Sequence, residues 1–529
     1  MVKSLKKMLC VSLLTGILYS QLIVKTVGTS GYETGNSFIR LESGNFIIVG
    51  NRGNNILLTK VNSSFNPIWS KEIGGDSIEY GYSVIQTSDK NVVLTGLGYD
   101  YNSGASGILI SKFDTNGNHI WSRLISYPNL SPSSGPHSII EIQDGSLYVV
   151  GSGRPPGEYF EVFLSKFDAN GNHLWSKTIG GGLEDYSTEI ISTSDNGLLI
   201  VGSIYLSVGG HDHLLVLKLS REGALTWYKA IYEQNIYGYE WINGVIQSQD
   251  GGFVIVGATR NPTISRDIFI AKLDMNGNII WSKALGSIGT YSDAYSVIQL
   301  NNGNFVLIGT NGNDLILSSF DQSGNHLWTK SLGEISYQDG GKCLLKTNSG
   351  NTYFLGSTRS YGSGNYDIII GNFDQNGNIC IGTAIQPTIY EPSWLNYGTY
   401  IQVRDQTPDI ISLNPTITNV SLTSVTLCLL GEEDKDSKKH FDQFSSLQII
   451  FCPVFFDDKI ILKFEGFYKN PLGIFLYNSS GVKLLEYTYA HSYPVIELKG
   501  KEIKNLKKGV YFLRVYSGKR EIGSFKIVK

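Results

Sequence analysis

A tryptophan that returns at nearly constant spacing limits the possible folds of this chain more than any other feature. The intervals between its copies are 52, 54, 52, 54, 47 and 52 residues when the last position, a cysteine, is included. A period of this length is typical of chains built from one supersecondary unit repeated many times. The seven positions are Trp69, Trp121, Trp175, Trp227, Trp281, Trp328 and Cys380.

Each unit divides into four short segments rich in β-branched and aromatic residues, which predicts four strands. In the second unit they are YSVIQT, NVVLTG, GILISKFD and HIWSRLI. The turn before the last strand has the form DxNGN in several units, and its Asn-Gly pair supplies the positive φ that a hairpin turn needs. These segments resemble a calcium loop only faintly, because the distal glutamate of such a loop is missing.

Four strands per unit and a period of about 50 residues predict the blade of a β-propeller. One four-stranded sheet cannot bury both faces, whereas seven packed radially bury them against each other and leave few open edges. The predicted fold class is therefore all-β: a seven-bladed β-propeller over residues 21–385, followed by a small antiparallel β-sandwich C-terminal domain. We expect the repeated tryptophan to fill the core between blades near the outer strand.

Two segments compete to close the ring. LIVKTVG, residues 22–28, resembles the fourth strand of the other units, so the N-terminus would supply an outer strand to the last blade. CIGTAI, residues 380–385, would instead complete the last blade from within the same copy. The sequence does not decide between these two.

The first residues have the pattern of a secretory signal peptide. Lys3, Lys6 and Lys7 precede an apolar stretch from Met8 to Tyr19 that is too short to span a bilayer as a stable helix. Residues 1–20 are therefore predicted to be removed on export, with a membrane anchor as the alternative. We expect no transmembrane segment in the mature chain. The net charge of −3 gives no electrostatic footprint for nucleic acid.

Four cysteines remain beyond the signal peptide, at Cys343, Cys380, Cys428 and Cys452. Sequence cannot choose among their possible pairings. Cys380 with Cys428 is preferred because both flank the end of the repeat region, and free buried thiols are the alternative. No pair has the C-x-x-C spacing of a zinc or redox site, and no phosphate loop or H-E-x-x-H motif is present. We therefore predict no metal and no cofactor.

The repeat rhythm stops after residue 385. Residues 386–445 are predicted as a spacer that crosses the propeller or forms a small ordered unit, and they include the exposed mixed-charge run GEEDKDSKKH at residues 431–440. From residue 446 a compact β pattern begins, which predicts an antiparallel sandwich. Its strands are expected at residues 459–464, 472–477, 482–487, 495–498, 509–516 and 521–528.

The segments FCPVFFDDKIILKFEG, GIFLYNSSGVKLLE, IKNLKKGVYFLRVYSG and GSFKIVK resemble the C-terminal (type A) sorting domain of type IX secretion system substrates. That family shows a strand ending in Gly-x-x-(Leu/Val), a Leu-x-x-Gly-x-Tyr motif leading into a hydrophobic strand, and a basic end. The entry strand departs from the family, since only Pro453 remains of its Tyr-Pro-Asn-Pro. The matching residues are Gly481, Leu506, Gly509, Tyr511, Phe512, Arg514, Val515, Lys526 and Lys529.

The resemblance implies a protein that is secreted or held on the outer cell surface. The signal peptide would carry the chain across the inner membrane. Residues 446–529 would then engage the type IX secretion machinery as a partner and guide passage through the outer membrane, after which such domains are often cleaved. The propeller units similarly resemble the repeats of secreted surface propellers that carry this tail.

In a propeller, the loops between the second and third strands share one rim with the loops between the fourth and first strands. Here these loops are long, irregular and rich in Tyr, Trp and Arg, whereas the other turns are short and uniform. Variable loops on one rim of a regular scaffold predict a binding face. The candidate ligand-binding residues are Tyr99, Tyr101, Tyr159, Tyr237, Tyr239, Trp241, Arg260, Arg359 and Tyr361.

Two groups of polar residues suggest other chemistry. The HDH triplet at residues 211–213 has metal-ligating types, but Asp212 aligns with turn aspartates in other units. Glu184, Asp185 and Glu240 lie in rim loops, where two carboxylates would suit a glycan hydrolase or lyase. We expect a non-catalytic protein that binds a glycan or protein ligand. The alternatives are an extracellular glycan-degrading enzyme and a structural component of an extracellular layer.

Overall fold

The computed structural model describes residues 22–430 apart from short segments, and the strands of residues 448–528. In that part of the chain, no helix has the length and apolar character needed to cross a membrane. The predicted signal peptide and the mixed-charge run lie outside the described residues. The segments left out are 1–21, 75–77, 101–104, 127–135, 155–158, 182, 207–210, 234–239, 261–265, 287–290, 334–337, 363–364, 385–386, 391, 393, 398–401, 407–408, 414–416, 421–422, 431–447, 452–458, 466–471, 479–481, 490–494, 500–505, 507–509, 518–519 and 529.

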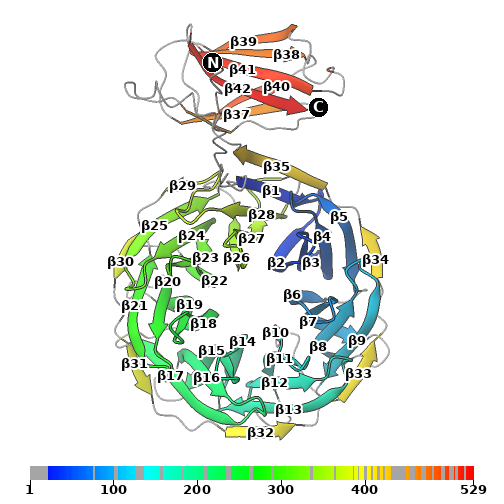
Figure 1. The fold of residues 1–529 in the computed structure, drawn as a ribbon, viewed down its shortest axis with the longest axis vertical. Helices are drawn as coiled ribbons and strands as arrows, with labels where there is room; N and C mark the ends of the chain where they lie inside the picture. The colour runs from blue at the N-terminus through cyan, green and yellow to red at the C-terminus, as the bar shows by residue number, and fades with distance from the viewer. Residues whose placement is uncertain are drawn as a thin grey trace, which may run out of the picture.

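Seven antiparallel sheets stand in a ring around a central axis, which confirms the seven-bladed propeller (Figure 1). In each blade the first strand lies nearest the axis and the fourth lies near the outside. Blades 1 to 4 consist of β2 (Glu33–Arg40), β3 (Phe46–Arg52), β4 (Asn55–Val61), β5 (Pro67–Ile73); β6 (Tyr80–Gln86), β7 (Val92–Asp100), β8 (Ala105–Phe113), β9 (His119–Ser126); β10 (Pro136–Glu141), β11 (Leu147–Gly153), β12 (Glu161–Phe167), β13 (His173–Gly180); and β14 (Asp185–Ser192), β15 (Leu198–Leu206), β16 (His211–Leu219), β17 (Leu225–Glu233). Blades 5 to 7 consist of β18 (Trp241–Gln247), β19 (Phe253–Arg260), β20 (Arg266–Leu273), β21 (Ile279–Gly286); β22 (Ser292–Gln299), β23 (Phe305–Asn311), β24 (Asp314–Phe320), β25 (His326–Leu332); and β26 (Asp339–Lys346), β27 (Thr352–Thr358), β28 (Asp367–Phe373), completed by β1 (Leu22–Gly28).

The ring closes through its N-terminal strand. β1 pairs antiparallel with β28, in the register Val24↔Gly371, and so becomes the fourth strand of blade 7. The competing segment does not complete this blade, because β29 (Thr383–Ala384) pairs instead with β25 of blade 6. One blade therefore contains strands from both ends of the repeat region, which locks the ring without leaving an open blade edge.

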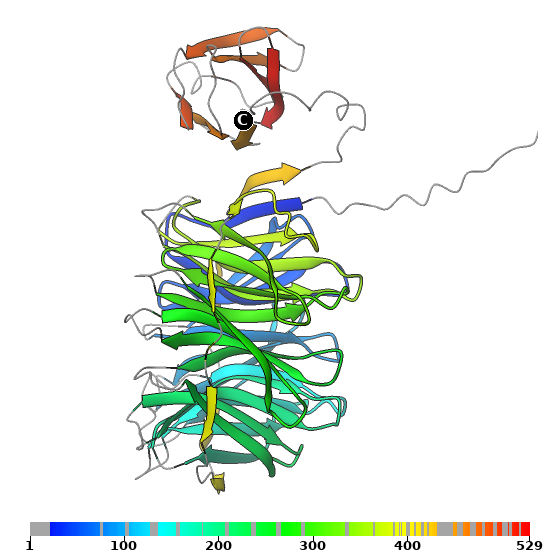
Figure 2. The same ribbon diagram turned by 90° about the vertical axis from the view of Figure 1, so that its left-hand side faces the viewer.

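A belt of single strands, residues 383–430, runs around the outside of the ring against the order of the blades (Figures 1 and 2). Each belt strand pairs antiparallel with the fourth strand of one blade, taking blades 6, 5, 4, 3, 2, 1 and 7 in turn. Every sheet of the propeller thus has five strands. After β29, the belt strands are β30 (Thr388–Tyr390), β31 (Trp394–Tyr397), β32 (Gln402–Gln406), β33 (Asp409–Leu413), β34 (Ile417–Val420) and β35 (Thr423–Leu430).

The belt corrects the prediction that residues 386–445 are a spacer, because the propeller continues to residue 430. The blade rhythm is missing from the sequence here for a simple reason: each belt segment adds one strand to a different sheet, so no four-strand unit repeats. The outer edge of a blade would otherwise present unpaired backbone groups to other chains. The belt pairs with some or all of that edge in each of the seven blades.

The repeated tryptophans pack between blades, as predicted. Each lies on a fourth strand, and a glycine in the third-to-fourth turn of the next blade sits against its ring. A Cβ added at Gly171, for example, would lie 2.9 Å from Trp121, and the φ of Gly171 is +76°. Glycine is required there by both the close approach and the backbone conformation. The other pairs are Gly117 with Trp69, Gly223 with Trp175, Gly277 with Trp227, Gly324 with Trp281 and Gly377 with Trp328.

Blade 1 departs from this pattern in an informative way. Its turn has Phe65 in place of the glycine, with a φ of +60° that side chains rarely adopt. The strand before it in the ring is β1, where Ile23 occupies the position of the tryptophan. Phe65 is buried in the same core cluster as Ile23, and its ring lies 5.4 Å from that of Phe46. The phenylalanine therefore fills the space that a tryptophan fills at the other blade contacts.

Two cysteines in the propeller differ in state. Cys380 is disulfide-bonded, and its partner lies outside the described side chains. Cys343 is a free thiol on the inner strand β26. The predicted pairing of Cys380 with Cys428 stays a prediction.

The C-terminal region forms two antiparallel sheets with strand orders β36-β37-β40 and β39-β38-β41-β42. Its strands lie within two residues of the predicted ones wherever a strand was predicted. Alternate residues of the larger sheet are buried, such as Ile474, Leu476, Leu513 and Val515, so one face packs as a core. The strands are β36 (Gln448–Phe451), β37 (Lys459–Glu465), β38 (Leu472–Asn478), β39 (Lys483–Tyr489), β40 (Val495–Lys499), β41 (Val510–Ser517) and β42 (Arg520–Val528).

Candidate ligand-binding face

The long loops gather on one rim, here called the long-loop rim. At its base, the first residue of a first strand donates a backbone hydrogen bond to the second-to-third loop of the preceding blade. The N–H of Glu33 bonds to the carbonyl of Tyr366 at 2.8 Å, and that of Asp185 bonds to Phe160 at 2.7 Å. These bonds join the two kinds of long loop, so residues from neighbouring blades are held at one surface.

The opposite edge, here called the short-turn rim, consists of hairpin turns that satisfy themselves. In the turn at Asp114, one carboxylate oxygen accepts the N–H groups of Asn116 and Asn118 at 2.8 and 2.9 Å. The other oxygen accepts the side-chain amide of Asn118 at 2.8 Å. Asp168, Asp274, Asp321 and Asp374 repeat this arrangement. The DxNGN segments are therefore hairpin turns, as predicted, and their acceptors are already occupied.

A β-bulge interrupts every first strand at the same point. In blade 1 the register with β3 shifts between Gly35 and Ser37, which leaves Asn36 as the extra residue. A bulge re-aims a side chain relative to the regular pleat. The seven extra residues are Asn36, Tyr82, His137, Thr188, Asn243, Tyr295 and Lys342.

Several of these bulge residues tie one blade to the next. The side-chain amide of Asn36 donates to the carbonyl of Gly81 at 2.7 Å, and that of Asn243 donates to Ala294 at 2.8 Å. The hydroxyl of Thr188 donates to the carbonyl of Ile242 at 2.5 Å. These three bulge residues therefore have a structural role, which is to connect neighbouring blades. Lys342 makes no such bridge among the described residues, where its ammonium group contacts the ring of Tyr295.

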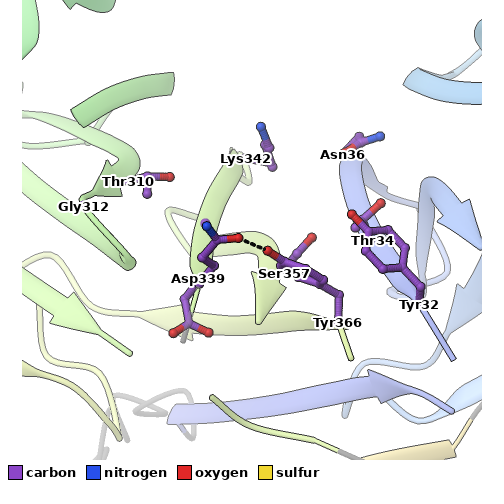
Figure 3. A pocket seen from close by; sticks show the side chains of 11 residues that line it. Tyr32, Thr34, Asn36, Thr310, Gly312, Asp339, Lys342, Ser357 and Tyr366 are labelled. Atoms are coloured by element: carbon purple, nitrogen blue, oxygen red, sulfur yellow. Dashed lines mark hydrogen bonds between the residues drawn. The ribbon is translucent and has the colours of Figure 1, made fainter. Parts of the chain in front are cut away.

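A cavity of about 410 Å³ opens where the long-loop rim meets the inner strands of blades 6, 7 and 1 (Figure 3). Its size falls within the usual range for small-molecule sites. Hydroxyl, amide and aromatic side chains line it, with one lysine. The lining residues are Tyr32, Thr34, Asn36, Thr310, Gly312, Gln338, Asp339, Gly340, Lys342, Ser357 and Tyr366.

Lys342 projects into this cavity (Figure 3). Its Nζ lies 3.6 Å from the centre of the Tyr295 ring, which favours the cation. Burial lowers the pKa of Lys342, while the charge of Asp293 raises it. Asp293 is itself 3.4 Å from the guanidinium of Arg266, which also stacks 4.5 Å above Trp241.

The aromatic wall of the cavity consists of two tyrosines. Tyr32 and Tyr366 meet edge to face with ring centres 5.0 Å apart, and Tyr32 is 45% exposed. The hydroxyl of Tyr366 donates to Oε1 of Gln338 at 2.5 Å (Figure 3). The guanidinium of Arg359 lies 5.4 Å over the Tyr366 ring. The wall is therefore held from both blades 7 and 1.

The carboxylates considered for catalysis do not line this cavity. Asp185 is buried and accepts the N–H of Gly181 at 2.8 Å. Burial, with the nearby charges of Glu161 and Asp212, raises the pKa of Asp185 to about 8. Glu240 is buried as well, whereas Glu184 is exposed and accepts the Tyr186 hydroxyl at 3.0 Å. Asp185 therefore anchors the loop between β13 and β14 through its hydrogen bond with Gly181.

The nine predicted ligand residues fall into different settings. Arg359 stacks on a cavity tyrosine, and Trp241 lies under Arg266 next to Asp293. Tyr361 packs against the core of blades 6 and 7, and Tyr99 is half-buried in β7. Tyr159 is 50% exposed on the rim at blade 3. Tyr101, Tyr237 and Tyr239 lie outside the described residues, as does the side chain of Arg260.

None of the five whose side chains are described lines the cavity, and the role of all nine in binding stays a prediction. Two of the residues that line it, Asn36 and Lys342, were missed because a strand pattern does not reveal a bulge. A signal was nevertheless available. When the repeats are aligned, the bulge position varies from blade to blade within a constant frame, and Lys342 is the one lysine or arginine found there. A charged residue at this bulge position in one blade alone indicates that the residue does not serve a structural role shared by all the blades.

No three His, Cys, Asp or Glu side chains gather as metal ligands among the described residues. In the HDH triplet, His213 is buried with its ring 5.0 Å from Tyr232, and the side chain of His211 is not described.

No protein-family model matches the sequence, and no curated protein matches it either. Solved propeller structures are similar at low identity. A glucose dehydrogenase has a TM-score of 0.36 at 13% identity, covering 58% of this chain and 99% of its own. The polysaccharide lyase Uly1 scores 0.41 at 10% identity, covering 64% and 90%. Drosophila Plexin A, solved with Semaphorin 1b, scores 0.39 at 11% identity, covering 66% and 86%. At these scores the likeness says nothing about what this chain binds.

The chain is thus an all-β protein with a seven-bladed propeller and a small C-terminal pair of sheets. Within that class, its distinguishing features are the belt of fifth strands and the polar cavity on the long-loop rim.

Proposed function

We propose that this chain is a non-catalytic binding protein of the outer cell surface or the extracellular space, and that the cavity on the long-loop rim takes up its ligand. The observation that carries the proposal is the cavity itself. It combines an exposed aromatic edge, several hydroxyl and amide groups, and a cation without an ion pair among the described residues. A few convergent polar groups beside aromatic side chains are typical of a specific binding site.

The chemistry of the rim favours binding over glycan cleavage. A hydrolase needs two carboxyl groups facing the same bond at a fixed separation. Asp339, the acidic residue of the cavity lining, is buried and accepts the N–H groups of Arg359 and Ser360 at 3.0 and 3.2 Å. Its carboxylate therefore holds the loop after β27 rather than facing a substrate.

A glycan is the ligand class that this lining suits best, because sugar hydroxyls match the neutral polar groups and sugar faces pack on aromatic rings. The test is a glycan array probed with the mature full-length chain, together with a pull-down for protein ligands. A ligand found in either should bind at least about tenfold more weakly to Tyr32→Ala, the loss expected when a hot-spot aromatic is truncated.

Tyr159→Ala is the matched control, since Tyr159 is a similarly exposed tyrosine on the same rim but away from the cavity. Equal loss in both variants, or loss in neither, would contradict the cavity as the binding site.

Export is the second part of the proposal. A signal peptide at residues 1–20 and a type IX sorting domain at residues 446–529 would deliver the propeller to the outer surface. Support comes from the motif resemblance and from two sheets whose strands fall at the predicted positions.

Deletion of residues 446–529 should leave the protein in the periplasm, as measured by cell fractionation. The propeller of the truncated chain should stay protease-resistant, which separates a secretion defect from misfolding. Normal surface display of the truncated chain would rule out the sorting role.

A further inference from the structure

We infer that the ligand of the long-loop rim carries an anionic group, and that this group is the carboxylate of an acidic sugar held beside Lys342. The inference rests on the proposed function, because it names the substrate class of the same cavity. Its evidence is the balance of charge and of hydrogen-bond donors around that lysine.

The cavity contains one cation whose charge is not used by a salt bridge in the described residues. Lys342 comes from the bulge of β26, and its Nζ contacts the face of the Tyr295 ring at 3.6 Å. Asp293 interacts with it electrostatically, but Asp293 is also 3.4 Å from the Arg266 guanidinium. The local charge of these three groups sums to +1, which an anionic ligand would neutralise.

The remaining lining includes several groups that can donate to an anion. Thr34 and Thr310 contribute hydroxyls, and Tyr32 adds a phenol. Gln338 accepts the Tyr366 hydroxyl through Oε1, so its amide NH₂ remains as a donor. A carboxylate can accept several of these hydrogen bonds at once, and only a charged group would also pair with Lys342.

The one carboxylate of the lining does not compete for the lysine. Asp339 points away from Lys342 in Figure 3, toward the loop whose N–H groups it accepts. An incoming anion would therefore meet no uncompensated negative charge at this end of the cavity. A buried pair of Lys342 with a carboxylate would also be screened little by salt compared with surface pairs.

A saccharide is favoured over an acidic peptide by the rest of the wall. Tyr32 and Tyr366 present an aromatic edge and face beside the lysine, and the other lining groups are small hydroxyls and amides. The cavity is also short of apolar side chains, which a peptide would need for anchoring. A pyranose ring with one carboxylate matches both the aromatic wall and the cation.

The probes are oligosaccharides of galacturonate, glucuronate and mannuronate. The methyl ester of each is the uncharged control. Isothermal titration of the full mature chain should give binding to at least one acid form, with its ester at least about tenfold weaker, the loss expected for a charge-assisted contact. In Lys342→Met the acid and ester should bind equally, whereas Lys342→Arg should keep part of the preference for the acid. Thermal unfolding of both variants checks that they fold.

Three results would overturn the inference. Acid and ester forms could bind the wild-type chain equally, the preference could persist in Lys342→Met, or a poly-glutamate peptide could bind with the same Lys342 dependence while no uronate binds. If only neutral glycans bind and Tyr32→Ala removes them, the anionic class fails while the proposed function stands. If Tyr32→Ala changes the binding of no ligand, the proposed function itself fails.

Discussion

The two rims of the propeller are built by the same seven repeats, yet they treat their polar groups in opposite ways. On the short-turn rim, the aspartates of the DxNGN turns accept hydrogen bonds from their own turns, and hydrogen bonds from Asn118 keep the pKa of Asp114 low although burial raises it. On the long-loop rim, Lys342 and the hydroxyls around it face a cavity. Repetition thus marks residues used by the fold, and under the proposed function the residues that vary are those that contact a ligand.

The same contrast appears within a single strand position. Asn36 and Asn243 use their bulge side chains to bridge blades, while Lys342 at the equivalent place does not. The fold can spare one such bridge because the belt and the N-terminal strand already hold the ring. In the proposed function, the ligand contact therefore uses a position where the scaffold has a redundant contact.

We expect the largest effect from removing the belt, which pairs with every blade and so supports both rims. Deleting residues 383–430 and joining residue 382 to residue 431 would expose the outer edge of all seven blades. We expect aggregation and an apparent loss of several kcal/mol in unfolding free energy, because every blade loses the backbone pairing of its belt strand. Size-exclusion chromatography and thermal unfolding measure it. A monomer with unchanged stability would mean that the belt is dispensable.

A substitution at Phe65 tests whether the packing of Phe65 against Ile23 replaces the glycine–tryptophan packing found at the other blade contacts of the short-turn rim. Phe65→Gly should relieve the positive φ but open a cavity next to Ile23, and a net loss of about 2–4 kcal/mol is expected. The double variant Ile23→Trp with Phe65→Gly restores the pair found at the other blades and should regain part of the loss. Chemical unfolding would contradict the account if the single variant were more stable than the wild type.

The inner strand β14 should respond to pH through Asp185 at its start and Glu189 in its middle. Burial raises the pKa of Asp185 to about 8 and that of Glu189 to about 7. Both groups ionise near pH 4 in the unfolded chain, so the folded state binds more protons between these values, and stability falls as pH rises from about 5 to 8. Asp185→Asn should reduce that fall by a few kcal/mol at most. Denaturant unfolding at pH 5 and pH 8 is the measurement, and an unchanged slope in the variant would contradict it.

A smaller effect separates backbone strain from blade packing on the short-turn rim. Gly171→Ala and Gly145→Ala impose the same positive φ, +76° and +79°. Only the first adds a methyl group within 2.9 Å of a tryptophan ring, since the nearest neighbour at Gly145 is 3.7 Å away. We expect Gly171→Ala to cost about 1–3 kcal/mol more than its control. Equal losses would show that the Trp121 contact does not restrict this position.

Much of the fold could be predicted because the repeats are redundant. Seven aligned copies reveal four strands, the turn glycines and the place of the tryptophans, even though each copy alone is ambiguous. The belt could not be predicted, since its strands are as short as Thr383–Ala384 and each pairs with a distant partner. Long-range pairing of this kind leaves no local pattern.

The candidate site was predictable only as a rim. Loop length and aromatic content indicated the edge of the ring at which the cavity lies, but they favoured loop residues such as Tyr159 over the inner strands. Lys342 enters the cavity through a bulge, and Tyr32 and Tyr366 meet it from two other strand ends. The spacing of residues along the sequence does not show that residues of blades 6, 7 and 1 line one cavity.

The most direct test of this ligand site is a crystal structure of the full mature chain with an acidic oligosaccharide that binds it in solution. We expect ligand density in the cavity, with a carboxylate within hydrogen-bond distance of Lys342 Nζ and a sugar ring against Tyr32. Density on the short-turn rim, or on the long-loop rim away from Lys342, would contradict it.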